Sequence, residues 1–262
     1  MNGIERIAQA IDAARQDQRP ALVAFMTGGF PTRESFQDHL ESLTTHADLV
    51  EIGVPFTDPM ADGVTIQNSS KVALEQGVTL GWILDEIGQR EWPAPILLMS
   101  YLNPLIAMGD QLAPRCKAAG VAGIICPDLP LDENDLLKPD LEANALALVN
   151  LVTPVTTPER LKQLCDTATG FVYAVTVTGT TGGAKSGGPG NAAPVTETVV
   201  DYLKTIKQVS NVPVCAGFGI RTPEQVTALG AHADGVIVGS ALVEQLAEGN
   251  DPGVFLQYLK GQ

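Results

Sequence analysis

The sequence lacks any long apolar segment. No run approaches the roughly 20 apolar residues that a membrane-spanning helix requires. Residues 1–20 have the pattern of an amphipathic helix with charges throughout, without the apolar core of a signal peptide. These absences predict a cytoplasmic protein that begins with a helix over residues 1–18 and has no membrane as a partner.

Positive charge is scarce. The 262 residues include 16 Lys and Arg against 30 Asp and Glu, which gives a formal net charge of -14. Such a chain is repelled by phosphate backbones and by anionic lipid surfaces. The composition therefore argues against nucleic acid as a partner and favours small molecules or proteins.

Side chains that usually bind transition metals are few. The four cysteines are far apart in the sequence and form no C-x-x-C pair, which is typical of buried, reduced thiols. The three histidines fall on or beside predicted helices and turns, so none is placed like a ligand or a general base. We therefore expect no metal site built on imidazole. The residues concerned are Cys116, Cys126, Cys165, Cys215, His39, His46 and His232.

Strand-length apolar runs alternate with helical patterns along the whole chain. The predicted strands are Ala21–Thr27, Asp48–Val54, Ile96–Tyr101, Gly123–Pro127, Ala147–Val152, Phe171–Thr178, Val212–Gly217 and Gly235–Val238. Among the helices predicted between them are Leu105–Ala119 and Leu131–Ala143. Eight strands, each followed by a helix, predict an α/β fold of the (β/α)₈ TIM-barrel class, with one domain over residues 1–262. The alternative is an open doubly wound sheet, although no G-x-G-x-x-G turn follows the first strand.

Two carboxylates stand out at the end of the second predicted strand. Glu51 lies in Leu-Val-Glu-Ile-Gly-Val, where burial of an unpaired carboxylate costs several kcal/mol or raises its pKa. A raised pKa suits a general acid/base. Asp62 follows on a looser loop and is expected to stay ionised. Two carboxylates in unlike environments can divide acid and base work between them.

Glycines gather at the ends of the last strands. Gly217, Gly219 and Gly239 let the backbone approach a ligand, and Ser240 is predicted to cap a short helix. Together with Gly182 they predict an anion nest, the phosphate site that many barrels build after strands seven and eight, without need of an arginine. The alternative is that these glycines only permit tight turns.

Two rival chemistries use other residues. A Schiff-base aldolase needs a lysine at an inner strand end, whereas the lysines lie on predicted helices apart from Lys185, which falls on a loop. A Mg²⁺ site is a further alternative, with oxygen ligands from Glu51, Asp58, Asp62 and Asp128.

The motifs described above resemble those of one known family. Val50–Gly63, VEIGVPFTDPMADG, resembles the signature of the tryptophan synthase alpha chain family. The agreement continues in the same order over nearly the whole chain, in five further blocks at Leu98–Pro104, Val121–Pro130, Phe171–Gly182, Gly217–Pro223 and Asp234–Ala241.

The resemblance implies a lyase that cleaves indole-3-glycerol phosphate by a retro-aldol step to indole and glyceraldehyde 3-phosphate. Glu51 stands at the position of the family's general acid/base, and Asp62 at that of the aspartate that hydrogen-bonds the indole N–H. The implied substrate-binding residues are Phe25 and Tyr101 as apolar walls, Tyr173 beside the glutamate, Thr181 on the closing loop, and Gly182, Gly219, Gly239 and Ser240 at the phosphate.

The resemblance also implies a partner, a pyridoxal-phosphate-containing beta chain in an α₂β₂ complex that receives indole through a tunnel. The loop around Asp58 and the strand-six loop would couple the two chains, and the alpha chain itself would carry no cofactor. Two alternatives stay open at this stage. One is an alpha-like subunit that only binds and activates its partner, and the other is a different phosphate-binding barrel such as an isomerase.

Three features depart from the usual pattern of the family. Val64 replaces a proline, which predicts a less rigid loop after Asp62, and Phe30 replaces an aspartate that faces the partner. Residues Gly183–Pro194 form a longer, glycine-rich segment, which we expect to be a mobile lid that orders with substrate.

Overall fold

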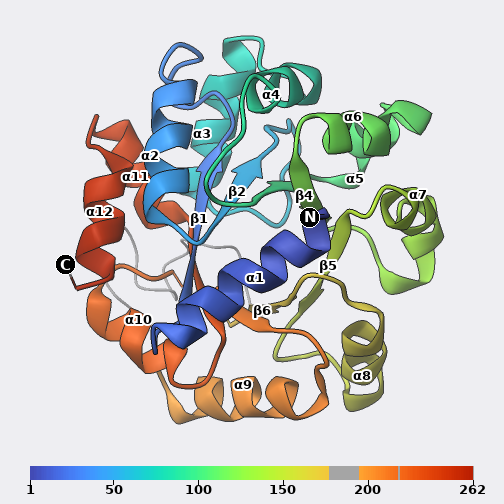
Figure 1. Cartoon of the computed structure of the whole chain (residues 1–262), viewed down its shortest axis with the longest axis vertical. Helices are drawn as coiled ribbons and strands as arrows, with labels where there is room; N and C mark the ends of the chain where they lie inside the picture. The colour runs from blue at the N-terminus through green and yellow to red at the C-terminus, as the bar shows by residue number, and fades with distance from the viewer. Residues whose placement is uncertain (177–194, 218, 262) are drawn as a thin grey trace.

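Eight parallel strands close into a barrel in sequence order in the computed structural model, which describes residues 1–176, 195–217 and 219–261 (Figure 1). The first strand pairs with both the second and the eighth. This closure confirms the predicted (β/α)₈ barrel, and the open doubly wound alternative is wrong. The strands are β1 (Ala21–Thr27), β2 (Leu49–Gly53), β3 (Ile96–Met99), β4 (Val121–Ile125), β5 (Ala147–Val152), β6 (Val172–Val175), β7 (Val214–Gly217) and β8 (Gly235–Val238).

Helices cover the outside of the barrel, and two of the predicted ones are divided. The helices are α1 (Gly3–Gln16), α2 (Phe36–His46), α3 (Val64–Glu75), α4 (Leu80–Ile87), α5 (Leu102–Ile106), α6 (Leu112–Ala118), α7 (Lys138–Ala143), α8 (Pro158–Thr167), α9 (Glu197–Val209), α10 (Pro223–Gly230), α11 (Ser240–Ala247) and α12 (Pro252–Leu259), with 3₁₀ turns η1 (Gly109–Gln111) and η2 (Leu131–Leu136). The predicted helix over Leu105–Ala119 is interrupted because Gly109 has a φ of +51°, outside the helical region. The predicted helix over Leu131–Ala143 becomes η2 followed by α7, and Pro139 lies in the first turn of α7, where proline is tolerated.

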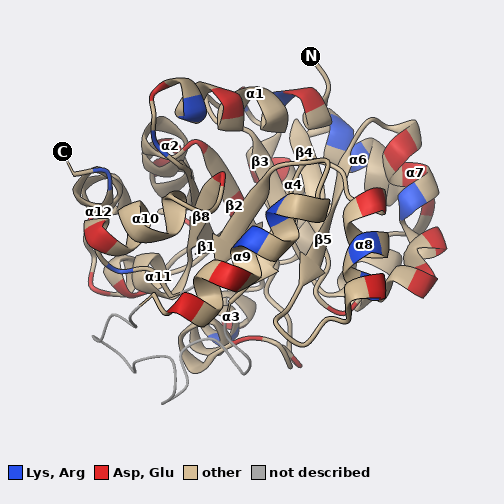
Figure 2. Ribbon diagram, turned by 90° about the horizontal axis from the view of Figure 1, so that it is seen from below, with Lys and Arg blue, Asp and Glu red and all other residues tan. Residues whose placement is uncertain are grey.

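The helix α1 closes the amino-terminal end of the barrel (Figures 1 and 2). Its buried residues Ile7, Ile11 and Ala14 recur at helical spacing and pack in one cluster with inward-facing residues of the strands. Gly3 lies so close to β4 that a side chain at this position would collide with the backbone of Ala122. The interior of the barrel can therefore open only at the other end, where the strands terminate.

A buried aspartate ties several elements together near α1. Asp234 precedes β8, and only 8% of its side chain is exposed. Its carboxylate accepts hydrogen bonds from Arg15 of α1 at 2.9 Å, Lys207 of α9 at 2.6 Å and the Val214 N–H of β7 at 2.8 Å. Burial alone would raise the pKa of this carboxyl, but its hydrogen bonds outweigh burial and the pKa is lowered.

We expect Asp234→Asn to lower the free energy of unfolding by about 2 kcal/mol at pH 7, because a neutral amide cannot replace the carboxylate that accepts from Arg15, Lys207 and the buried Val214 N–H together. The pKa of Asp234 is lowered in the folded protein, so its contribution is complete above the ordinary value of about 3.8 and is lost as the pH falls below it. Urea unfolding at pH 7 and at low pH measures both effects.

The matched control is Asp166→Asn, which removes an exposed ion pair with Lys162 within α8. Such a pair contributes less than about 0.5 kcal/mol. If Asp234→Asn and Asp166→Asn lost equal free energies of unfolding, Asp234 would not join these elements as proposed. A loss in Asp234→Asn that is as large at low pH as at pH 7 would also contradict this role.

Two further predictions from the sequence can be compared with the fold. All four cysteines are free and buried, as predicted. Within the described part of the chain, none of the helices is both long enough and apolar enough to cross a membrane.

Candidate active site

The strand β2 directs Glu51 into the interior of the barrel. Side chains alternate along a strand, and Leu49 belongs to the interior cluster while Val50 and Ile52 pack toward the outer helices. Glu51 is fully buried, and neither of its carboxylate oxygens has a hydrogen-bond partner among the described residues. Burial raises the pKa of Glu51 to about 8, so the side chain carries a proton at neutral pH, as the sequence predicts.

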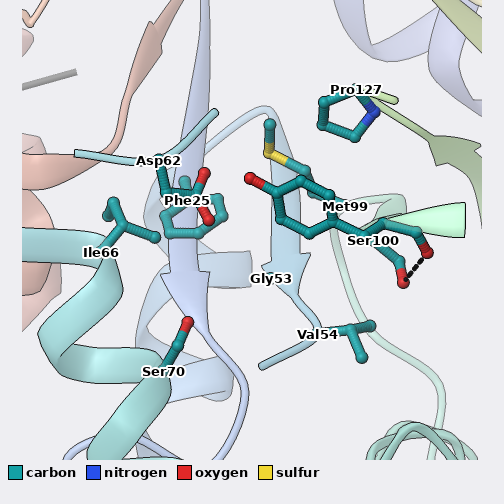
Figure 3. Close-up of a pocket in the computed structure, with 10 residues that line it drawn as sticks. Phe25, Gly53, Val54, Asp62, Ile66, Ser70, Met99, Ser100 and Pro127 are labelled. Carbon is teal, nitrogen blue, oxygen red and sulfur yellow. Dashed lines mark hydrogen bonds between the residues drawn. The ribbon is translucent and has the colours of Figure 1, made fainter. Parts of the chain in front are cut away.

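Asp62 lies in the loop between β2 and α3, on the wall of a small cavity at the carboxyl end of the strands (Figure 3). Asp62 is half-buried in this loop. Burial raises its pKa to about 6, although the nearby hydroxyl of Tyr101 lowers it in part. Asp62 is therefore ionised at neutral pH, as expected, while Glu51 is not.

Tyr101 holds the loop that carries Asp62. Its ring stacks on Phe56 with centroids 5.2 Å apart, and its hydroxyl accepts a hydrogen bond of 2.9 Å from the N–H of Ala61. Tyr101 also lines the cavity, together with Phe25. Both residues predicted as apolar walls therefore lie beside Asp62.

The cavity is narrow in this conformation. Its volume is about 20 Å³, which is room for about one water molecule. Phe25 lies on the wall of the cavity, and its ring is accommodated because the facing residue is Gly53, where a Cβ would lie 2.5 Å from the ring. A larger aromatic ligand therefore requires the side chains of the wall to move.

Tyr173 of β6 lies close enough to Glu51 and Asp62 for both carboxylates to affect its pKa. Burial raises its pKa, and the charges of Glu51 and Asp62 raise it further. The sequence predicts Gly217 as a close approach to ligand, but the space above it is occupied by Tyr173, because a Cβ at Gly217 would lie 2.8 Å from the tyrosine ring and hydroxyl. Because Gly217 has no side chain, Tyr173 can occupy this position.

The turns after β7 and β8 have the features of an anion site. Gly219 has a φ of +67°, and no atom of the other described residues, its chain neighbours aside, lies within 4 Å of the place where its Cβ would be. The predicted capping role of Ser240 is wrong, because Gly239 is the N-cap of α11 and Ser240 is its first residue. Ser240 is 6% exposed, and its hydroxyl has no partner among the described residues. A buried, unsatisfied hydroxyl beside the free N–H groups of a helix start is suited to an anionic ligand.

Several predicted features lie outside the described residues or away from the cavity. Thr181, Gly182 and the predicted lid Gly183–Pro194 lie outside the described residues. Phe30 is 7% exposed and packs in the core, so it is not a surface contact for a partner, whereas Val64 is the exposed first residue of α3. The described residues contain no group of three or more histidine, cysteine or acidic side chains placed to hold a metal ion, so the four carboxylates of the Mg²⁺ alternative do not converge.

Sequence reasoning missed one charged group beside the anion turns. Arg221 follows Gly219 by two residues, in the loop between β7 and α10, and forms a bidentate ion pair with Glu244 of α11 at 2.7 and 2.9 Å. The only signal in the sequence is the position of the arginine after the Gly-Phe-Gly-Ile turn. Its partner could not be identified from spacing alone.

A parallel eight-stranded barrel with a protonated glutamate inside it and an ionised aspartate at its carboxyl end is the framework of a barrel lyase. Residues 11–257 match the family model described as tryptophan synthase alpha chain. The chain belongs to the tryptophan synthase alpha chain family.

Relatives and solved structures agree over almost the full length. The tryptophan synthase alpha chain of Nitratidesulfovibrio vulgaris strain Hildenborough is 43% identical over 256 residues, 96% of each chain. That of Methanocaldococcus jannaschii is 38% identical and covers 92% of this chain and 84% of its own. A chain in a structure of Mycobacterium tuberculosis tryptophan synthase superposes with a TM-score of 0.86 at 32% identity, covering 97% of this chain and 96% of that one. The alpha chain from Legionella pneumophila has a TM-score of 0.85 at 29% identity, covering 100% and 97%.

Proposed function

We propose that this chain cleaves indole-3-glycerol phosphate to indole and glyceraldehyde 3-phosphate. The observation that carries the proposal is Glu51, a fully buried carboxyl without a hydrogen-bond partner among the described residues, in a chain of this family. An unpaired buried acid is costly for folding, and its raised pKa is what a general acid/base needs near neutral pH.

The two carboxyl groups have distinct roles in the proposed reaction. Protonated Glu51 gives its proton to C3 of the indole, and the ionised Asp62 stabilises the positive charge that appears at the ring nitrogen. The Glu51 carboxylate then takes the proton of the adjacent glycerol hydroxyl. As that oxygen forms the aldehyde carbonyl, the bond to C3 breaks and its electron pair restores aromatic indole.

The remaining residues would bind the two ends of the substrate. Phe25 and Tyr101 would contact the indole ring, since both line the cavity beside Asp62. The phosphate would lie at Gly219, Gly239 and Ser240, where backbone N–H groups and a buried hydroxyl supply donors without a positive charge. Tyr173 would contact the substrate between these two ends.

We also propose that the chain assembles with a beta chain, which alone would hold pyridoxal phosphate. Large apolar side chains are exposed on the segments that follow β2, β3, β4 and β5, which are consecutive in the barrel. Exposed apolar groups gathered at one rim are typical of a protein interface. The residues are Met60, Val64, Ile106, Leu136 and Val155.

The test is indole release from indole-3-glycerol phosphate by the purified chain, with and without a beta chain. We expect the rate to fall below about pH 6, where Asp62 takes up a proton, and above about pH 8, where Glu51 loses its proton. No release under either condition would refute the lyase and favour a subunit that only activates its partner. Failure of indole propanol phosphate to compete with substrate would favour a different phosphate-binding barrel.

A further inference from the structure

An ion pair joins the two turns of the proposed phosphate site. Arg221 donates from Nη1 to Oε2 of Glu244 at 2.7 Å and from Nη2 to Oε1 at 2.9 Å. The two side chains are only 20% and 26% exposed. A bidentate, partly buried pair of this kind has a fixed geometry and is stronger than a mobile surface contact.

Each partner is attached rigidly to one of the turns. The backbone N–H of Arg221 donates to Oε1 of Gln225 at 2.8 Å, which fixes the loop just after Gly219. Glu244 follows Ser240 by four residues on α11, so the two side chains share one face of that helix. The ion pair therefore sets the distance between the turn that contains Gly219 and the helix start that contains Ser240.

The same glutamate extends the connection to a third segment. Its Oε1 lies 3.5 Å from the hydroxyl of Thr65, in the first turn of α3, and α3 packs against α11. Thr65 is three residues after Asp62. Glu244 thus lies between the proposed phosphate turns and the loop that carries the ionised carboxylate.

We propose that Arg221 and Glu244 are positioning residues that hold the phosphate turns in register with each other and with the Asp62 loop. The inference rests on the proposed function. We assign Arg221 a positioning role and not a phosphate contact, because Glu244 engages one N–H of each of its terminal nitrogens and neutralises its charge. The phosphate donors are then backbone N–H groups and the Ser240 hydroxyl, fixed in advance by a pair whose charges cancel.

The experiment compares Arg221→Ala, Glu244→Ala and the exchanged double variant Arg221→Glu with Glu244→Arg, using glycerol 3-phosphate as the probe. We expect each single change to raise its dissociation constant about tenfold, and the exchanged pair to come back to within about threefold of wild type, since paired residues are not additive. In indole release, KM should rise while kcat changes less than about twofold.

A direct ligand would behave differently. If Arg221 bound phosphate, Glu244→Ala would free it, and glycerol 3-phosphate would bind as well as to wild type or better, which would overturn the proposal. Equal weakening in the singles and the exchanged pair would also overturn it. Arg160→Ala is the matched control, because Arg160 makes a bidentate pair with Asp132 at 2.7 and 3.2 Å in which the Asp132 side chain is 77% exposed. We expect it to bind like wild type.

The two proposals fail in different ways. If wild type binds glycerol 3-phosphate but releases no indole, the proposed reaction is wrong. The positioning role is then decided by the dissociation constants of glycerol 3-phosphate in the variants. If wild type releases indole while both alanine variants keep its KM, the reaction stands and the positioning role is wrong. Urea unfolding of each variant shows that binding is compared between folded proteins.

Discussion

Replacement of Glu51 by glutamine is expected to slow indole release from indole-3-glycerol phosphate by at least about a thousandfold, the upper part of the range for loss of a general acid/base. Glutamine has the shape of the protonated acid but cannot give up or take up the proton. The side chain is fully buried, with no hydrogen-bond partner among the described residues, so no neighbour there is placed to substitute for it. Single-turnover rates of wild type and variant measure the effect.

Unfolding measurements on the same variant show whether the fold is preserved. The pKa of Glu51 is raised from 4.5 to about 8 in the folded protein, so its proton stabilises the fold. This contribution is complete below about pH 4.5 and is lost as the pH rises to about 8, at roughly 1.4 kcal/mol per pH unit. The glutamine variant should lack this slope and be more stable than wild type at pH 8.

The control for this experiment is Glu159→Gln, at an exposed position in the first turn of α8. It should have the rate of wild type and the same dependence of stability on pH. Unchanged activity in Glu51→Gln would remove Glu51 from the mechanism. If the free energy of unfolding of Glu51→Gln depended on pH as strongly as that of wild type, the Glu51 carboxyl would not be the group with the raised pKa.

Asp62→Asn is expected to slow the same reaction by about a hundredfold, because the amide stabilises the charge at the indole nitrogen less well than a carboxylate does. The fall in rate below about pH 6 should also disappear, since that fall reports protonation of Asp62. Rates measured from pH 5 to pH 9 test both expectations. The fall above about pH 8 should remain in the variant.

Asp110→Asn provides the control, since Asp110 is an exposed aspartate on η1. We expect the full bell-shaped profile of wild type in this variant. If Asp62→Asn kept its low-pH limb, the group that titrates near pH 6 would lie elsewhere, and the division of roles between the two carboxyls would need another basis.

Burial gives the two carboxyl groups different pKa values. Glu51 lies inside the barrel and has its pKa raised to about 8, while Asp62 lies on the cavity wall and has its pKa raised to about 6. At neutral pH one is therefore protonated and the other ionised. No charged partner is needed for this difference, which depends on how far each group is removed from water.

Part of the fold and of the candidate site can be predicted from local sequence patterns. The eight apolar runs predicted the barrel because strand periodicity depends on neighbouring residues alone. Glu51 was identified because a carboxylate among aliphatic residues is anomalous whatever surrounds it in space. The glycine-rich turns after β7 and β8 were also recognised, since their residue types signal close backbone approach.

Other features depended on contacts between residues far apart in the chain. The burial of Asp62 against Tyr101, the room that Gly217 leaves for Tyr173, and the attachment of Arg221 to Glu244 all join different strands and helices. The sequence alone determined which strands form, where the barrel carries its acid, and the family. Only the tertiary structure decided which groups face each other, because burial and pairing are set by the closed barrel and not by spacing along the chain.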